Sequence, residues 1–206
     1  MLKTVAIIYL LLTSSLIAEP AEPLRFESGT KKNTLIELYT SEGCSSCPPA
    51  EEFLNNLRNK KELWKTWVPV AFHVNYWDYI GWKDRYATEE FGLRQSKYAS
   101  LKHASTVYTP AFMVNGSGWR RGLFSRAIPV EKSSTGNLVV SIDGKSVQAN
   151  YQPLKLNIAV LGMELTSQIE RGENEGRTAN HEFVVVGYDS ITSNVSQENN
   201  LPWQCG

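Results

Sequence analysis

Residues 37–50 read ELYTSEGCSSCPPA, and this stretch decides the fold of the 206-residue chain. The residues that lead into it are mainly apolar, so residues 34–39 predict a short strand interrupted only by Glu37, and residues 40–43 suit a turn. The prolines at 48 and 49 are tolerated in the first turn of a helix, and apolar side chains then recur at helical spacing up to residue 57. The pattern therefore places both cysteines where a strand passes into a helix.

Cys44 and Cys47 form a Cys-x-x-Cys pair at this junction. The unpaired N–H groups and the dipole of a helix N-terminus stabilise a thiolate on the first cysteine. We therefore expect Cys44 to be a solvent-reachable nucleophile and Cys47, one turn further in, to be the resolving thiol in thiol–disulfide exchange. No cofactor is expected. The alternatives are a static disulfide that braces a turn and a metal site built from both thiolates with His73 or His103. Neither histidine stands at a sequence spacing from a second potential ligand that is typical of metal sites, so no metal is expected.

The segments that follow predict a thioredoxin-like α/β domain over residues 34–130. A strand, a helix capped by Thr88, a hairpin with Asn115-Gly116 at its turn and a short closing helix are expected at residues 68–74, 88–101, 111–121 and 123–130. The resulting β-α-β-α-β-β-α order is that of a thioredoxin fold. A linker at 131–136 precedes residues 137–206, interpreted as a small β-rich C-terminal appendage with strands at 138–142, 146–151, 154–161 and 183–186.

Thr109 and Pro110 stand immediately before the expected hairpin. We predict that Pro110 is cis, because a cis proline there leaves backbone groups near Thr109 free to pair with an extended peptide substrate. Trp77, Asp78 and Trp82 follow the second strand, at the edge of an α/β sheet where ligands usually bind, and are further candidates for the substrate groove. The alternative is that the aromatic side chains cover the core and Asp78 caps a turn.

Glu37 lies inside a predicted buried strand, near where thioredoxins place an acid that moves protons to the resolving cysteine. It is a candidate proton relay. Glu37 falls one position earlier than the thioredoxin acid, however, so strand alternation turns its side chain to the opposite face of the sheet, which favours a carboxylate that pairs with another group there. Other charged and polar groups have structural interpretations: a packed helix face for Arg94, Gln95 and Tyr98, and turn and interdomain contacts for Glu173 and Arg177.

The first 18 residues are typical of a secretory signal, with Lys3 before an apolar run and Ala18 at a possible cleavage site. Residues 19–33 are expected to be a lead-in without a core pattern. We therefore predict a periplasmic or secreted protein, with membrane contact only if the signal segment is not cleaved. Of the three cysteines, Cys205 has no obvious partner. The 21 basic and 21 acidic residues balance, so nucleic acid is not an expected partner.

The chain resembles the exported family catalogued as domain of unknown function 1223. The resemblance spans most of the chain and rests on residues 37–50, 72–78 (FHVNYWD), 81–84 (GWKD) and 107–110 (VYTP). That family is assigned to the thioredoxin-like superfamily, and its later segment often carries a motif similar to residues 172–178, GENEGRT. The resemblance implies the same fold and the association of Cys44 and Cys47 with Pro110, but no substrate, since the biochemical activity of the family is not established.

Two departures from the family pattern stand out. Asn75 occupies a position where aspartate is expected, and the tail beyond Ser190 looks unlike the family, so the resemblance gives Cys205 no role. Three functions follow from the sequence: an exported thiol–disulfide oxidoreductase acting on protein or peptide disulfides, a redox-inactive peptide-binding or protein-binding module, and a metal-handling protein. The direction of exchange stays open, because the reduction potential set by Ser45 and Ser46 does not follow from the sequence.

Overall fold

The computed structural model describes residues 24–27, 32–119, 139–143, 146–149 and 154–193. The expected signal segment, the helix at 123–130, the linker at 131–136 and Cys205 lie outside these residues. The elements are β1 (Leu24–Glu27), β2 (Thr34–Thr40), α1 (Pro48–Asn55), the 3-10 helix η1 (Asn56–Asn59), β3 (Trp67–His73), the 3-10 helix η2 (Asn75–Ile80), α2 (Glu89–Ser100), β4 (Ala111–Val114), β5 (Ser117–Gly118), β6 (Val139–Asp143), β7 (Ser146–Ala149), β8 (Leu154–Gly162), β9 (Leu165–Gln168), β10 (Thr178–His181) and β11 (Val184–Ser193).

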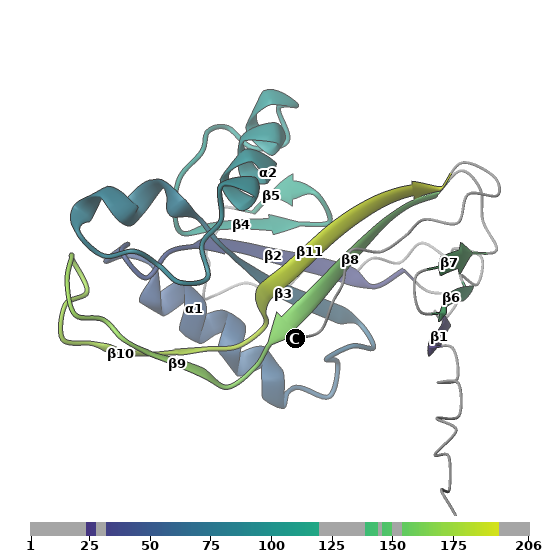
Figure 1. Cartoon of the computed structure of the whole chain (residues 1–206), viewed down its shortest axis with the longest axis horizontal. Coiled ribbons are helices and arrows are strands. Elements are labelled where there is room, and N and C mark those ends of the chain that lie inside the picture. The colour runs from purple at the N-terminus through teal and green to yellow at the C-terminus, as the bar shows by residue number, and fades with distance from the viewer. Residues whose placement is uncertain (1–23, 28–31, 120–138, 144–145, 150–153, 194–206) are drawn as a thin grey trace, which may run out of the picture.

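A six-stranded mixed sheet with the order β5-β4-β2-β3-β11-β8 forms the centre of this α/β fold (Figure 1). Strands β2 and β3 are parallel and in register from Thr34 opposite Trp67 to Thr40 opposite His73, whereas β4 is antiparallel to β2. The two parallel strands therefore end side by side. The segments that follow them, the Cys-x-x-Cys turn and η2, start from the same edge of the sheet.

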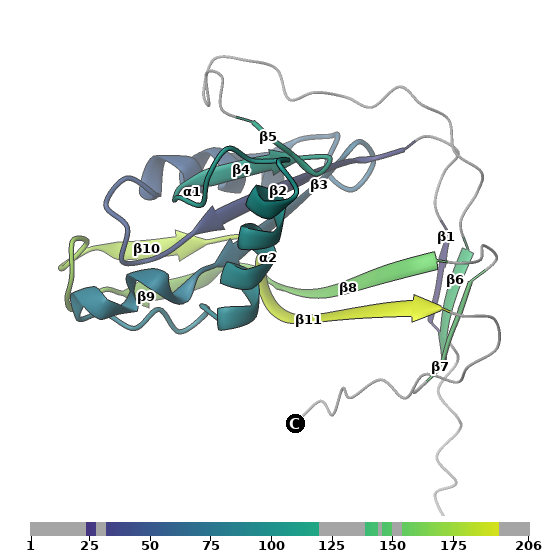
Figure 2. The ribbon, with the colours of Figure 1, turned by 90° about the horizontal axis from the view of Figure 1, so that it is seen from above.

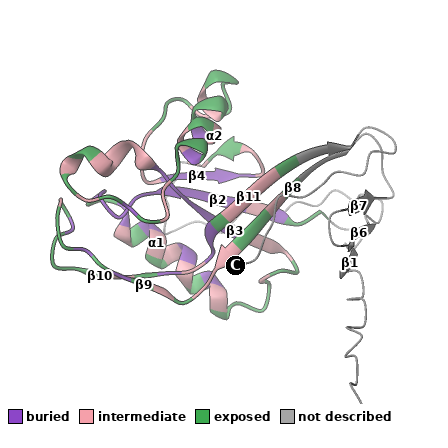
Figure 3. Ribbon diagram, in the orientation of Figure 1, coloured by how far each residue is buried: buried purple, intermediate pink, exposed green. Residues whose placement is uncertain are grey.

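Alternation along β2 divides the core between the two faces of the sheet. Ile36 and Leu38 pack with α1, and Tyr39 packs with Phe91 of α2, so the two helices cover opposite faces (Figure 2). Strands β2 and β4 are buried along nearly their whole length (Figure 3). These contacts confirm the strands expected from residue 34 and at 111–114 and the helix expected from Pro48. Asn115 and Gly116 both have positive φ at the hairpin turn, as the Asn-Gly signal predicts.

The C-terminal segment differs from the separate appendage that we expected. Strands β8 and β11 pair with each other and continue the central sheet, and Val184 and Val185 of β11 are fully buried in it. Strands β6 and β7, by contrast, form a three-stranded sheet with β1, which lies in the lead-in where no element was expected. The boundary near residue 131 therefore does not separate two sheets, because β11, which follows it, pairs with the edge of β3, and β8 pairs with β11.

Thr88 caps α2, as its sequence position predicts: its Oγ1 accepts a hydrogen bond of 3.3 Å from the backbone N–H of Phe91. We expect Thr88→Ala to lower the free energy of unfolding by about 1 kcal/mol, since one N–H of the first turn loses its acceptor. Urea denaturation followed by tryptophan fluorescence measures the change. Thr106→Ala, at an exposed threonine in a loop, is the matched control. Equal stability of the two variants would contradict a capping role.

Candidate functional site

Cys44 and Cys47 are joined by a disulfide at the N-terminus of α1. The turn after β2 is held by a backbone hydrogen bond from Cys44 N–H to Ser41, and Cys47 is the N-cap residue, whose carbonyl accepts from the N–H groups of Ala50 and Glu51. The predicted strand-to-helix position of the pair is confirmed. Cys47 thus stands directly at the start of α1, and Cys44 lies in the turn before it.

Pro110 is cis, as predicted, and stands at the start of β4. The next residue, Ala111, pairs with Tyr39, so the proline lies at the end of β2 from which the Cys-x-x-Cys turn starts. Trp77 connects the two segments: its indole N–H donates to Thr109 Oγ1 at 2.7 Å, and its Cβ lies against Gly43. The structure thus brings Thr109, Pro110 and Trp77 to the same sheet edge as the disulfide.

The expectation that Cys44 is solvent-reachable is wrong for this structure, because both cysteines are 0% exposed. The loop between β9 and β10, formed by the GENEGRT motif, lies against the turn that carries them. The Asn174 side-chain amide donates to the carbonyls of Glu42 and Cys44 at 2.8 and 2.9 Å, and the N–H of Ser45 donates to Glu173 Oε2 at 3.1 Å. The disulfide is therefore closed off by a segment about 130 residues later in the chain.

On the other side of the turn, η2 contributes to the closure. Gly43 packs so tightly on η2 that a Cβ there would lie 3.1 Å from the Ile80 side chain, and Gly172 of the β9–β10 loop packs on the same isoleucine. Gly172 and Gly176 both have φ of +81°, which makes glycine the favoured residue at these turns. The Cys-x-x-Cys turn is thus enclosed between η2 and the β9–β10 loop.

Trp82 and Asp78 both have partners inside the protein. The Trp82 indole N–H donates to Glu42 Oε2 at 2.7 Å, and Asp78 Oδ1 accepts from the backbone N–H of Asp84 at 3.2 Å. Burial raises the pKa of Asp78 above its ordinary value. Asp78 therefore caps a turn, the structural alternative that the sequence left open, while Trp82 fixes the carboxylate of Glu42.

The structure does not bring Glu37 to the disulfide. Glu37 is fully buried on the α2 face of β2, where Arg94 donates to its Oε1 from Nη2 at 2.6 Å and from Nε at 3.0 Å, and Tyr98 donates to its Oε2 at 2.6 Å. Its proposed proton-relay role is therefore wrong, since α1 and the sulfurs lie on the opposite face. The interpretation of Arg94 and Tyr98 as a packed helix face is confirmed.

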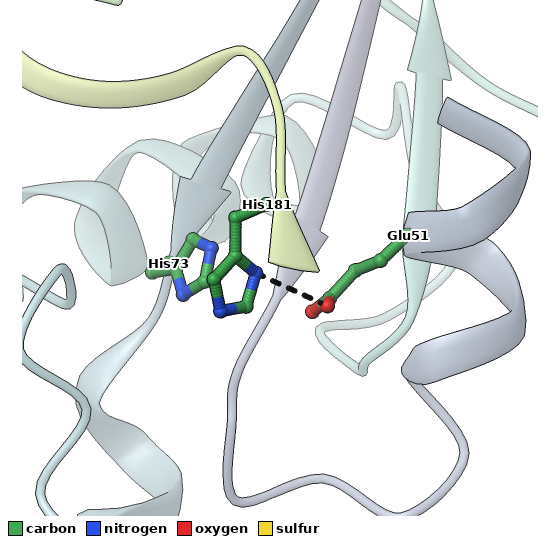
Figure 4. A group of neighbouring side chains, drawn as sticks. All are labelled: Glu51, His73 and His181. Carbon is green, nitrogen blue, oxygen red and sulfur yellow. Dashed lines mark ion pairs between the residues drawn. The ribbon is translucent and has the colours of Figure 1, made fainter. Parts of the chain in front are cut away.

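A buried group of histidines and carboxylates lies where β2, β3, α1 and β10 meet, and sequence reasoning missed it (Figure 4). His73 Nδ1 lies 2.7 Å from Asp84 Oδ2. His181 lies between two carboxylates, with Nε2 3.1 Å from Glu42 Oε1 and Nδ1 3.3 Å from Glu51 Oε2. The sulfurs of Cys44 and Cys47 are bonded to each other and do not join this group, so among the described residues the two thiolates and His73 do not form a metal site.

The pKa values in this group reflect competition between burial and pairing. Burial lowers the pKa of His181, but its hydrogen bonds to Glu42 and Glu51 outweigh burial and raise the pKa to about 9. Burial raises the pKa of Glu42 and of Asp84, yet the hydrogen bond with His181 and the interactions with His73, respectively, hold each pKa below its ordinary value. Without any other ligand, the group is thus a network of buried ion pairs.

The fold and the site define an α/β protein with a Cys-x-x-Cys disulfide at a helix N-terminus. The chain belongs to the family described as Protein of unknown function (DUF1223), whose model matches residues 35–205. The match confirms the resemblance read from the motifs. It also includes the tail, so the expectation that residues beyond Ser190 depart from the family is wrong. No helix in the described part of the chain has the length and apolar character needed to span a membrane.

Two solved structures are similar to this one. The crystal structure of protein AGR_C_4864 from Agrobacterium tumefaciens is 25% identical in sequence, with a TM-score of 0.55 over 77% of this chain and 72% of that chain. HBP35 of Porphyromonas gingivalis is 14% identical, with a TM-score of 0.47 over 84% of this chain and 62% of that chain. No curated protein matches this sequence.

Proposed function

We propose that the protein is an exported, thioredoxin-like thiol–disulfide oxidoreductase that acts on protein or peptide disulfides in the periplasm or outside the cell. The observation that carries the proposal is the Cys44–Cys47 disulfide at the N-terminus of α1, with cis-Pro110 at the same edge of the sheet. A disulfide persists in an oxidising compartment, which agrees with the secretory character of residues 1–18.

The arrangement of β2, α1, β3, α2, β4 and β5 supports a thioredoxin-like fold. Strands β2 and β3 are parallel and joined through α1, α2 covers the opposite face, and β4 and β5 form an antiparallel hairpin beside β2. The sheet order β3-β2-β4-β5 and the cis proline before β4 are what that fold requires. Strands β11 and β8 extend the sheet beyond β3.

The chemistry is a reversible exchange of two electrons. In the reduced protein, the Cys44 thiolate attacks a substrate disulfide, forms a mixed disulfide and releases one substrate thiolate. The Cys47 thiolate then attacks the Cys44 sulfur, releases the second substrate thiolate and leaves the Cys44–Cys47 disulfide. Two electrons pass from the protein to the substrate, and the reverse sequence oxidises a substrate dithiol. The helix N-terminus favours the thiolate form of Cys44 in both directions.

The substrate would lie along Thr109 and Pro110, beside Trp77 and Trp82, with Asp78 holding the shape of the η2 turn. Because Cys44 is 0% exposed, exchange requires the β9–β10 loop to move away from the turn first. The same burial favours a second candidate function, a redox-inactive binding module in which the disulfide only braces the turn. Reactivity of Cys44 toward a disulfide separates the two.

We expect Cys47→Ser, made in a Cys205→Ser background, to accumulate a mixed disulfide through Cys44 when it is mixed with an excess of a disulfide-bonded peptide. Without Cys47, no resolving thiol remains to release the substrate. Mass spectrometry of the acid-quenched protein measures the adduct and identifies the residue that carries it.

The matched control is Cys44→Ser in the same Cys205→Ser background, which keeps one cysteine at the buried N-cap position and should form much less adduct. Equal adduct on the two variants would contradict the assignment of Cys44 as the nucleophile. Absence of adduct on both, with the native fold retained, would favour the binding module.

A further inference from the structure

Three side chains from distant parts of the sequence aim ligand atoms at one point beside the Cys-x-x-Cys turn. Glu51 comes from the first turn of α1, His73 from the end of β3 and His181 from the end of β10, and one ligand atom from each lies within 4.8 Å of the other two. His181 Nδ1 and Glu51 Oε2 are 3.3 Å apart. Two ligands on one tetrahedral zinc ion, each bonded at about 2.0–2.1 Å, lie about 3.3 Å apart.

His73 has a ring nitrogen that the protein does not use. The residue is 0% exposed, its Nδ1 faces Asp84, and its Nε2 has no hydrogen-bond partner. A carboxylate only accepts hydrogen bonds, so the proton of a neutral His73 lies on Nδ1 and the lone pair lies on Nε2. An unused lone pair in a buried polar group costs free energy unless a ligand occupies it.

The groups that hydrogen-bond to these three residues are of the kind that orients metal ligands in metalloproteins. Each histidine has a buried carboxylate on the nitrogen turned away from the cluster: Asp84 on His73, and Glu42 on His181. The remaining ligand is oriented as well, because the Thr40 hydroxyl donates to Oε1 of Glu51 at 2.5 Å, while Oε2 faces His181 Nδ1 at 3.3 Å. A carboxylate behind each ligating histidine fixes its tautomer and strengthens it as a ligand.

The charge of the cluster favours a cation. Glu42, Glu51 and Asp84 are three carboxylates with side chains at most 12% exposed, and with both imidazoles neutral they carry three negative charges. A divalent ion reduces this to one. Uncompensated charge in a buried site is costly, so the arrangement needs a positive partner.

A polar cavity of about 460 Å³ borders the cluster at Glu51. It lies between α1 and the β9–β10 hairpin, and Glu42 and Glu51 are among the residues that line it. It is large enough for a hydrated ion and for a water molecule at a fourth coordination position.

We propose that Glu51, His73 and His181 bind a divalent transition-metal ion, with zinc as the reference ion, through Oε2, Nε2 and Nδ1. Two imidazoles and one carboxylate suit zinc, and three protein ligands leave one position open to the cavity. The competing assignment is a proton on His181 Nδ1 that occupies the same place between His181 and Glu51. The proposal does not depend on the reactivity of Cys44, because the sulfurs are not ligands.

Zinc titration of the disulfide-bonded Cys205→Ser protein tests the proposal, since this variant has no free thiol. Isothermal calorimetry should show one zinc per chain, and elemental analysis after gel filtration should find the same stoichiometry. We expect Glu51→Gln and His181→Gln to weaken binding by a hundredfold or more, and Glu42→Gln, which removes an outer partner, by about 10- to 100-fold.

His103→Gln is the matched control, because His103 is the exposed histidine outside the cluster, and it should bind zinc as the parent does. Far-ultraviolet circular dichroism verifies the fold of each variant. Glu51→Gln decides the test if His181→Gln does not fold, because it is isosteric and keeps an oxygen for Thr40. Absence of zinc binding to the folded parent, or equal binding by parent and Glu51→Gln, would overturn the proposal and leave His181 as a bridging imidazolium.

Discussion

Replacing Asn174 with alanine is expected to increase the rate at which a small thiol reduces the Cys44–Cys47 disulfide by about 5- to 150-fold. The Asn174 amide is 4% exposed and donates to two carbonyls of the Cys-x-x-Cys turn, those of Glu42 and Cys44. Removing it leaves buried acceptors without a donor in the closed state only, which costs about 1–3 kcal/mol. When closing is fast relative to reduction, the rate follows the open population, and that free energy corresponds to about 5- to 150-fold.

Each protein is exposed to dithiothreitol, and free thiols are alkylated in samples quenched at successive times. The increase in alkylated protein gives the rate of disulfide reduction. Asn59→Ala, at an exposed asparagine in η1, is the matched control and should reduce at the parental rate. Glu173→Gln should change the rate much less than Asn174→Ala, since its contact to the Ser45 N–H lies at the surface. Identical rates for Asn174→Ala and the parent would mean that the β9–β10 loop does not control access to the sulfurs.

The sequence predicted the elements whose signals are local. The strand before the cysteines, the helix after the two prolines and the Thr88 cap each depend on residues within one or two turns of each other, and all three are present. The cis peptide bond before Pro110 was also predicted, from its place before a hairpin strand. In each case, the backbone conformation is determined by residues close together in the sequence.

The closure of the disulfide and the histidine cluster could not be predicted in the same way. Asn174 contacts a turn 130 residues earlier, and His181 lies 139 residues after its partner Glu42. Strands β9 and β10 read LTSQ and TANH, too short and polar for a strand pattern, so nothing local indicated where His181 would lie. These contacts depend on how the hairpin packs along α1, which is a tertiary property.

For Glu37, the sequence predicted the face of the sheet but not the residue that pairs with the carboxylate. Strand alternation placed its side chain on the face opposite α1, and the structure agrees. The residue that compensates its charge, Arg94, stands 57 positions later on α2. The acidic groups near the disulfide are instead Glu42 and Glu51, which lie within seven residues of Cys44 in the sequence.

Arg94→Met is expected to lower the free energy of unfolding by about 3–5 kcal/mol, because it leaves the carboxylate of Glu37 buried without a cation. The Glu37 side chain is 0% exposed and that of Arg94 is 23% exposed. The guanidinium also lies over the rings of Phe72, Tyr98 and Tyr188 at 5.2 to 5.7 Å, contacts that the methionine replaces only in part. Urea denaturation at neutral pH, followed by tryptophan fluorescence, measures the loss.

The double variant Glu37→Gln/Arg94→Met separates the buried charge from the lost packing. If the uncompensated carboxylate causes most of the destabilisation, the double variant is more stable than Arg94→Met alone, since a neutral amide is far less costly to bury than an unpaired charge. Lys97→Met, at an exposed position on the same helix, controls for loss of a positive charge from α2 and should change stability by less than about 0.5 kcal/mol. A loss below about 1 kcal/mol for Arg94→Met would mean that water reaches Glu37 when the guanidinium is removed. Hydration of the carboxylate would then replace its ion pair with Arg94, and the predicted cost of an unpaired buried charge would be wrong.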